Sequence, residues 1–296
     1  MIPFVKEFDF AYGRPDRLSD LIVRVVAENP GPFTYTGSGT YLIGDAKGVA
    51  VIDPGPALDP HVDAICAAAP GPITDILVTH SHRDHCGGTD ALVARTGATV
   101  HAMPVRRQAS APDAPKHAPA LDEGVDESFA PTAHLSHEDI VRGPSFTLRA
   151  LHTPGHMAEH LCFHLEEEDV LFTGDHIMGW ATTVIAPPDG DMEDYLRSLD
   201  YLLTVPHRRY LPTHGAPIDD PLPFVEAVKA HRLARDEAIL AAALQAPRNA
   251  LEIVDEVYEG LVPALRPAAA LNVRAHLTRH IRLGTIHLDG EIYRKV

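Results

Sequence analysis

The chain has 296 residues, of which 45% are hydrophobic and 22% are charged, a composition typical of a soluble globular protein rather than a disordered or fibrous one. Its 41 acidic residues outnumber its 25 basic ones, and the net charge of −16 opposes nonspecific attachment to anionic membranes or nucleic acid. The sequence shows no apolar run of the roughly 18 residues that a membrane span needs, and its N-terminus lacks an export signal. We therefore expect a cytoplasmic protein with no membrane partner.

The chain contains three cysteines, Cys66, Cys86 and Cys162. They show no CxxC spacing and cannot all pair, which argues against a disulfide framework and against a zinc site built from thiolates. We expect reduced thiols, with Cys86 filling a small buried space.

Short β-branched runs that end in polar or glycine turns alternate with alanine-rich helical stretches, which predicts an α/β architecture. The expected strands are Tyr41–Ile43, Val49–Ile52, Ile76–Thr79, Val100, Leu148–Leu151, Val170–Thr173 and Arg209–Leu211, and the expected helices are Pro60–Ala69, Asp90–Thr96 and Met192–Leu203. Residues 104–147 are rich in Pro, Ala, Asp and His without periodicity, and we interpret most of this stretch as a surface insertion or lid.

The pattern changes near Pro223, which divides the chain into residues 1–222 and 223–296. One helix is expected over Phe224–Gln245, and a second begins at Asn249, where Glu252 completes a capping box. A third helix extends to about Leu283, and the following Asp289-Gly290 pair is a strong hairpin signal. Three helices and a hairpin predict a small C-terminal winged-helix domain.

The most informative segment, Ile76–Gly88, reads ILVTHSHRDHCGG, an apolar strand that leads into three histidines and an aspartate. Because side chains two apart on an extended chain point the same way, His80 and His82 can reach one ion. The turn that follows directs Asp84 and His85 toward a second position. A carboxylate among imidazoles suits zinc or a similar first-row ion.

Three more candidate ligands, His156, Asp175 and His214, each follow a predicted strand at a point where glycine allows a tight turn. Loops that follow such strands gather on one rim of a sheet, so these seven side chains are expected to converge. Asp53 also ends a strand, and we assign it a supporting role. His152 and His160 are candidates to contact the ligands from outside. The remaining histidines considered have no partner in such an arrangement: His101, His117, His134, His137, His164 and His207.

This order of motifs resembles the metallo-β-lactamase superfamily over about residues 35–220. The resemblance implies a four-layer αββα sandwich with two metal ions at its edge. It implies that His80, His82 and His156 bind the first ion, that Asp84, His85 and His214 bind the second, and that Asp175 bridges them.

A narrower resemblance is to the β-lactamase-like protein 2 branch, on the stretch Gly174–Ile185, the helix with His231-Arg232 and Arg235–Glu237, and the winged helix. It implies an endoribonuclease acting on single-stranded RNA, as in eukaryotic members. The chain departs from this branch in the 104–147 insertion, in His176 after the bridging aspartate and in its acidity.

We therefore expect a metal-dependent hydrolase with two zinc ions, or iron or manganese in their place. A bridging hydroxide would attack an ester, thioester or lactone, while Asp84 is the catalytic residue that shuttles a proton. One alternative is an endoribonuclease or phosphodiesterase on single-stranded RNA, favoured by Arg279 and Arg282, which we expect on the solvent face of the third C-terminal helix. A second alternative is an iron-dependent dioxygenase, or a protein whose metals are structural. The expected partner is a small-molecule substrate, with RNA as the alternative, and the C-terminal unit is expected to serve packing or homodimer formation.

Overall fold

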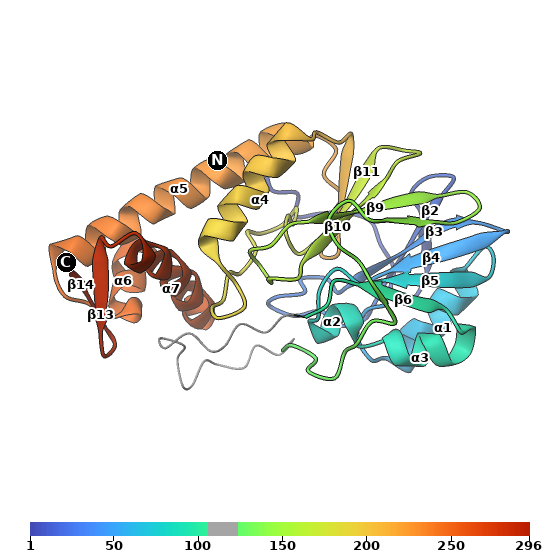
Figure 1. The fold of residues 1–296 in the computed structure, drawn as a ribbon, viewed down its shortest axis with the longest axis horizontal. Coiled ribbons are helices and arrows are strands. Elements are labelled where there is room, and N and C mark those ends of the chain that lie inside the picture. Colours follow the sequence, from blue (N-terminus) through green and yellow to red (C-terminus); the bar gives the residue numbers. More distant parts are fainter. Residues whose placement is uncertain (106–123) are drawn as a thin grey trace.

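The computed structural model describes residues 1–105 and 124–296, and two β-sheets packed face to face form the right half of the molecule in Figure 1. The first sheet follows chain order: β1 (Pro15–Arg17), β2 (Ile22–Val26), β3 (Gly39–Asp45), β4 (Gly48–Ile52), β5 (Ile73–Leu77), β6 (Thr99–Ala102) and β7 (Ala133–His134). The second has the order β12 (Arg209–Pro212), β11 (Val170–Gly174), β10 (Leu161–Leu165), β9 (Thr147–His152) and β8 (Ile140–Arg142). The first sheet is antiparallel up to β4 and parallel from β4 to β7, and only the β11–β12 pair is parallel in the second.

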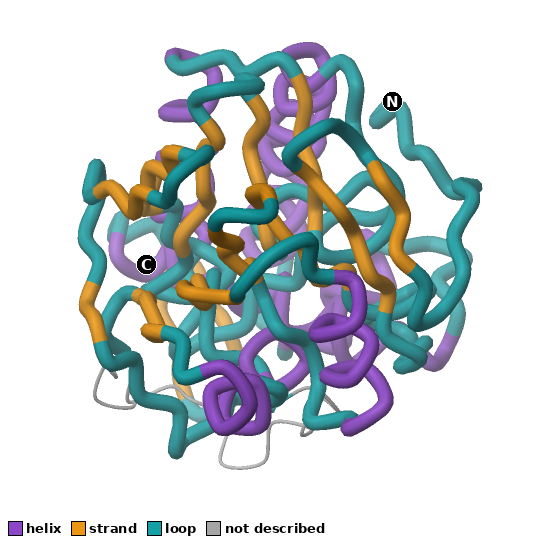
Figure 2. The backbone as a smooth tube through the Cα atoms, turned by 90° about the vertical axis from the view of Figure 1, so that its right-hand side faces the viewer, coloured by secondary structure: helices purple, strands orange, loops and turns teal. Residues whose placement is uncertain are grey.

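Three buried clusters define the layers. The cluster between the sheets includes Tyr41, Leu148 and Phe163. A second cluster joins the outer face of the first sheet to α1 (Asp59–Ala68) and α3 (Thr89–Thr96), and a third joins the second sheet to α4 (Met192–Thr204) and the start of α5 (Pro221–Gln245). Figure 2 shows the strands in the middle with helices on both sides. The short helix α2 (Arg83–Cys86) follows β5 and contains Asp84 and His85, the last two residues of the histidine motif.

The C-terminal residues form a separate buried cluster around Ile253, Val273 and Leu277. It comprises the end of α5, α6 (Ala250–Val257), the 3₁₀ turn η1 (Pro263–Leu265), α7 (Arg266–Arg282) and the antiparallel hairpin of β13 (Ile286–Asp289) and β14 (Ile292–Lys295). The predicted capping box is confirmed, since Asn249 Oδ1 accepts from Glu252 N at 3.0 Å and Glu252 Oε2 accepts from Asn249 N at 2.8 Å. Three helices and a hairpin are therefore present.

Several strands were not predicted. The run Ile22–Val26 forms β2 although it contains Arg24, whose buried guanidinium pairs with Asp16 at 2.7 Å. Within the stretch 104–147, β7 joins the first sheet and β8 joins the second, so this stretch is not wholly a surface insertion. Its residues 106–123, with His117, lie outside the described part of the chain.

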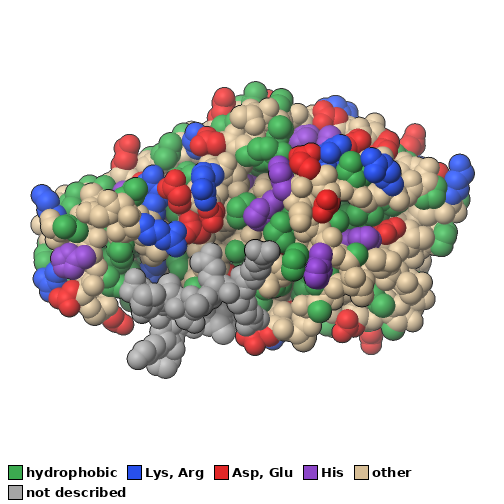
Figure 3. Space-filling model, in the orientation of Figure 1, with side chains coloured by type: hydrophobic (Ala, Val, Ile, Leu, Met, Phe, Trp, Pro, Cys, Tyr) green, Lys and Arg blue, Asp and Glu red, His purple; other side chains and the backbone are tan. Residues whose placement is uncertain are grey.

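We expected Arg279 and Arg282 on the solvent face of α7. Arg282 is exposed and Arg279 is partly buried, but both side chains are paired with acidic residues. Arg279 Nη1 donates to Asp236 Oδ2 on α5 at 2.7 Å, and its Nε donates to Glu193 on α4. Arg282 pairs with Asp191, the residue that caps α4. Both cations are thus used to join α7 to neighbouring elements, and Figure 3 shows basic and acidic side chains intermingled on the visible face. In the described ranges, none of the helices is both long and apolar enough to cross a bilayer.

Candidate metal centre

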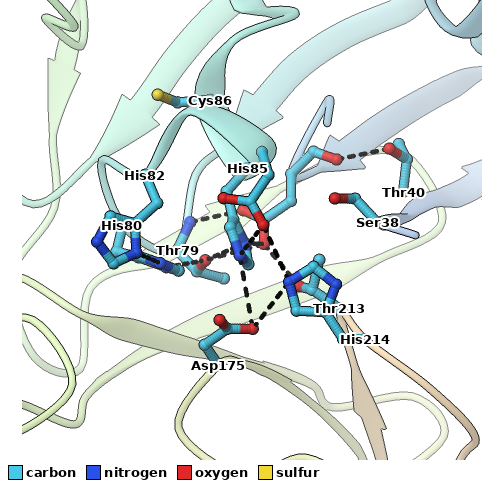
Figure 4. Close-up of polar contacts among 12 residues, drawn as sticks. Ser38, Thr40, Thr79, His80, His82, His85, Cys86, Asp175, Thr213 and His214 are labelled. Atoms are coloured by element: carbon cyan, nitrogen blue, oxygen red, sulfur yellow. Dashed lines mark hydrogen bonds and ion pairs between the residues drawn. The ribbon is translucent and has the colours of Figure 1, made fainter. Parts of the chain in front are cut away.

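The seven side chains of the sequence motifs converge at one edge of the sandwich, where the loops after β5, β9, β11 and β12 meet. Figure 4 labels His80, His82, His85, Asp175 and His214 of this set. A glycine is required at one of these turns. Gly174 has φ +49°, and a Cβ there would lie 2.6 Å from His160 Nε2. The tight turn at this glycine directs the next residue, Asp175, into the cluster.

One group of potential ligand atoms belongs to three histidines. His82 Nδ1 lies 2.9 Å from His80 Nε2 and 3.1 Å from His156 Nε2. His156 Nδ1 donates to the Val184 carbonyl at 2.7 Å, so the lone pair of its Nε2 faces the cluster. Thr79 Oγ1 donates to a carboxylate and therefore accepts from His80 Nδ1 at 3.0 Å. Both imidazoles are thereby held with an unprotonated nitrogen turned inward.

A second group contains one carboxylate and two imidazoles. Asp84 Oδ2 lies 3.0 Å from His214 Nε2 and 3.5 Å from His85 Nε2. His214 Nδ1 donates to the Gly37 carbonyl at 3.3 Å, which again turns Nε2 inward. The three side chains are buried, and their potential ligand atoms lie within 4.8 Å of one another.

Asp175 lies between the two groups. Its Oδ1 is 3.5 Å from His85 Nε2 and 3.4 Å from His214 Nε2. Its Oδ2 faces the other group, 3.8 Å from His156 Nε2. One carboxylate therefore offers an oxygen to each group.

Asp53 supports this arrangement from beneath. Its carboxylate accepts from His85 Nδ1 at 2.7 Å and from Thr79 N, Thr79 Oγ1 and Thr213 Oγ1 at 2.8 Å each. The side chain is completely buried, and four donors balance the cost of its burial. Asp53 thus fixes the His85 ring with Nε2 toward the cluster.

The histidines of the cluster divide into two classes by the direction in which their pKa values are shifted. Burial lowers the pKa of His80 well below its ordinary value and that of His82 to about 3, and neighbouring imidazoles add to the shift. Burial has the same tendency at His85 and His214. There, the carboxylates of Asp84 and Asp175 outweigh burial and raise both pKa values.

Both carboxylates are themselves held in the charged form. Burial alone would raise the pKa of Asp84 and Asp175, but His85 and His214 lower both below the usual range. Two buried carboxylates held in the charged form favour a bound cation, which would take the place of the protons on His85 and His214.

Four buried polar atoms make no hydrogen bond within residues 1–105 and 124–296. Asp84 Oδ1 is one, and the other three, His85 Nε2, Asp175 Oδ1 and His214 Nε2, have ion-pair contacts of 3.0–3.5 Å with one another or with Asp84 Oδ2. Buried polar atoms without hydrogen bonds are costly, and these four belong to one group of neighbouring side chains. Nitrogen and carboxylate oxygen donors are those that zinc and similar first-row ions take. The residues present therefore fit a site for a metal ion of this kind.

The other predicted residues divide into those near the cluster and those outside it. His160 Nε2 accepts from the backbone N of Asp175 at 3.3 Å, whereas His152 bonds to the Ala158 carbonyl and makes no hydrogen bond to the cluster. Cys86 is buried, as expected. His164 and His207 do have a partner, because both lie within 3.2 Å of Asp169 Oδ1 near the surface.

Two residues of the C-terminal helices reach the cluster through a loop. Arg232 was noted only for the family resemblance, and neither residue was predicted to act at the site. Arg232 on α5 donates to the Thr183 carbonyl and, at 3.3 Å, to Asn272 Oδ1 on α7. Asn272 Oδ1 also accepts from Ile185 N at 3.1 Å. These bonds hold the segment whose Val184 carbonyl orients His156. A signal was present, because Arg232 falls on the buried face of α5, where a charge requires a reason.

Comparisons with known proteins agree with this architecture. A family model described as the metallo-beta-lactamase superfamily matches residues 36–214. A Drosophila melanogaster protein named beta-lactamase-like protein 2 homolog is 31% identical over 288 residues, which cover 94% of this chain and 94% of that protein. An Aspergillus chevalieri protein named atrochrysone carboxyl ACP thioesterase is 32% identical over 234 residues, covering 76% of this chain and 67% of that protein.

The C-terminal helices are included in the structural likeness. A beta-lactamase domain protein from Burkholderia ambifaria superimposes with a TM-score of 0.78 at 20% identity, over 100% of this chain and 97% of that one. The fold is shared over the whole length, and the sequence match is extensive. The chain therefore belongs to the metallo-beta-lactamase superfamily and is a hydrolase of that superfamily.

Proposed function

We propose that the protein is a dinuclear metal-dependent hydrolase of esters, thioesters or lactones. The proposed ligands are His80, His82 and His156 for one ion and Asp84, His85 and His214 for the other, with Asp175 bridging. The observation that carries the proposal is the convergence of inward-facing ligand atoms on both sides of one carboxylate. Zinc is the proposed metal, with iron or manganese as the alternatives.

When bound, such a pair of ions supplies a hydroxide at neutral pH and polarises the carbonyl of the substrate. The protein's own contribution is to hold the ligands and to move a proton. We assign the proton transfer to Asp84, since its Oδ2 faces His214 while its buried Oδ1 has no hydrogen-bond partner in the described part of the chain. An oxygen without a partner, beside the reacting centre, is placed to accept and return a proton.

A small-molecule substrate is favoured over RNA. A relative is named as a thioesterase, and Arg279 and Arg282, the cations considered for nucleic acid, are paired with acidic side chains. The net charge of −16 also opposes binding to a polyanion. We place this reaction in the cytoplasm.

The proposal is tested by assaying the zinc-loaded protein against a thioester, a lactone and a short RNA in parallel, with Asp84→Ala as the blank. We expect turnover of the thioester or lactone that the variant lacks. Cleavage of RNA alone would replace the proposal by the endoribonuclease alternative. Iron-dependent oxygen consumption without hydrolysis would replace it by the dioxygenase.

We also propose that residues 223–296 form a winged-helix unit that packs against the sandwich. The pairing of Arg279 with Glu193 and Asp236, and of Arg282 with Asp191, supports a packing role. Removing residues 225–296 should lower the solubility of the protein and change its affinity for RNA to a smaller extent. A large loss of RNA binding in a gel-shift assay would contradict this role, and sedimentation of the full chain would test whether the unit forms a homodimer.

A further inference from the structure

A cavity of about 250 Å³ opens beside the cluster. Four proposed metal ligands, His82, Asp84, His156 and Asp175, belong to its lining. The rest of the lining comes from both parts of the chain, with loops of the sandwich on one side and α5, α7 and the segment between α6 and α7 on the other. A molecule in this cavity therefore contacts the cluster and the C-terminal helices at once.

The wall of the cavity is mainly apolar. It includes Phe33, Met178 and Trp180 from the sandwich and Leu261 and Leu265 from the C-terminal part. Arg232 is the one Lys or Arg among the described lining residues, and its guanidinium is occupied by the Thr183 carbonyl and by Asn272. This wall offers apolar contact and no array of cations for a phosphate chain.

One side of the cavity is rigid. The ring of Trp180 stacks on Tyr35, with the ring centroids 4.7 Å apart and an interplanar angle of 9°. Gly215 also lies against the indole, because a Cβ there would be 3.0 Å from Trp180 Cδ1. A flat apolar surface held in this way favours acyl groups that can pack against it.

We propose that this cavity binds the acyl part of the substrate, which makes the protein selective for thioesters or esters with an apolar aliphatic or aromatic acyl group. The inference rests on the proposed function, since it places the reacting carbonyl at the cluster. A cavity of about 150 Å³ holds a benzene molecule, so the larger space here accepts a substituted ring or a medium-length alkyl chain.

Two measurements test the proposal. The first compares kcat/KM for acetyl, butyryl, hexanoyl and benzoyl thioesters of N-acetylcysteamine. Burial of a methylene favours binding by about fourfold, so we expect a rise of at least about tenfold from acetyl to hexanoyl. The second follows the fluorescence of Trp180, the single tryptophan of the sequence, during titration with non-hydrolysable S-ethyl and S-hexyl thioethers. The S-hexyl compound should bind at least about tenfold more tightly.

A matched pair of variants locates the effect. Leu265 lines the cavity and Leu251 on α6 does not, and the two side chains are similarly exposed, at 39% and 43%. Leu265→Asp should reduce the preference for hexanoyl over acetyl to about threefold or less, because a carboxylate would enter the apolar wall. Leu251→Asp should leave the preference unchanged.

The outcomes separate this inference from the proposed function. Equal kcat/KM values across the acyl series would overturn the acyl site and leave the hydrolase intact. Graded thioether binding without turnover of any thioester would support the site and overturn the reaction. Displacement of the S-hexyl thioether by a short RNA would overturn the site in favour of a polyanion.

Discussion

Two groups of histidine and aspartate in this protein differ in what holds them. In the surface group of His164, Asp169 and His207, both imidazoles approach the same oxygen, Asp169 Oδ1, at 3.2 and 3.1 Å, and the carboxylate is half exposed. In the buried cluster around Asp175, the outer ring nitrogens are held by carbonyls, a hydroxyl and Asp53, and several inner ligand atoms lack partners. The imidazole N–H groups of the surface group can donate to one carboxylate oxygen, whereas the inward atoms of the buried cluster fit a bound cation. Proximity of ligand types is therefore a weaker indicator of a metal site than the direction in which their second atoms are held.

The largest expected effect comes from the bridging carboxylate. Asp175→Asn removes the charge that faces both groups, so bound metal should fall from about two equivalents to fewer than one, and kcat/KM should fall at least about 100-fold. Elemental analysis and the thioester assay measure both. Asp169→Asn is the same chemical change in the surface group and serves as the control. Retention of two equivalents by Asp175→Asn would contradict the bridging role.

The next effect concerns Asp53, which orients His85 from outside the cluster. Asp53→Asn keeps the shape of the side chain but removes the charge that orients His85, so metal affinity should fall by about 10–100-fold in competition with a chelator. Asp75→Asn is the matched control, because Asp75 accepts from His101 at 2.8 Å on the same sheet away from the cluster. Equal losses in the two variants would show that Asp53 acts through general stability.

A smaller effect concerns the stability contributed by a buried histidine that lies outside the cluster. His61 is buried beside Thr40 outside the cluster, and burial lowers its pKa to about 4 from an ordinary value of 6.5. The native state resists the proton that the unfolded chain accepts, so this histidine contributes its full stability above pH 6.5 and loses it as the pH falls toward 4. The loss is ~2 kcal/mol between pH 6.5 and 5.

Urea unfolding of the metal-free protein at pH 7.5, 6.5 and 5 measures this loss. His61→Gln should show a shallower fall in the free energy of unfolding than the parent chain, whereas His134→Gln, at an exposed histidine, should follow the parent. Identical slopes for the parent and His61→Gln would assign the acid sensitivity to other groups.

The smallest effect is expected in the surface group. Asp169 has φ +54°, a conformation that asparagine also adopts, and the amide oxygen of Asp169→Asn can still accept from both imidazoles. The free energy of unfolding should change by less than about 0.5 kcal/mol, in the presence or absence of zinc. A zinc-dependent stabilisation that this substitution abolishes would make the surface group a metal site and remove the contrast with the buried cluster.

The site was more predictable than the cavity beside it. The ligands follow strands whose ends meet at one edge, so the local motif around His80 and the glycine turn before Asp175 were enough to bring them together. The cavity joins Phe33, Trp180 and Leu265, which are far apart in sequence and share no periodic pattern. Its lining depends on how the C-terminal helices pack, and a single sequence does not encode that in any local signal.

The fold was predictable where a signal within a few residues marks an element. The hairpin and the capping box of α6 depend on residues close in sequence, and both were predicted. The strands β7 and β8 contain only two and three residues, too few for an alternating pattern to be recognised, and their pairing partners decide their structure. The ion pairs of Arg279 depend on α4 and α5, so helical periodicity alone placed this residue on a free face.

Helix α5 belongs to both halves of the molecule. Phe224, Val225 and Val228 near its start pack in the cluster under the second sheet, and Ile239, Ala242 and Ala243 near its end pack in the C-terminal cluster. Its 25 residues form a rod about 37 Å long, with Arg232 between the two ends. Inserting one residue into this rod would rotate the C-terminal residues beyond the insertion by about 100°. Their part of the cavity wall would then move away from the proposed metal ligands. Engineers who wish to exchange the C-terminal half for that of another relative must therefore join the chains in helical register, because the phase of this rod determines which side chains face the reacting centre.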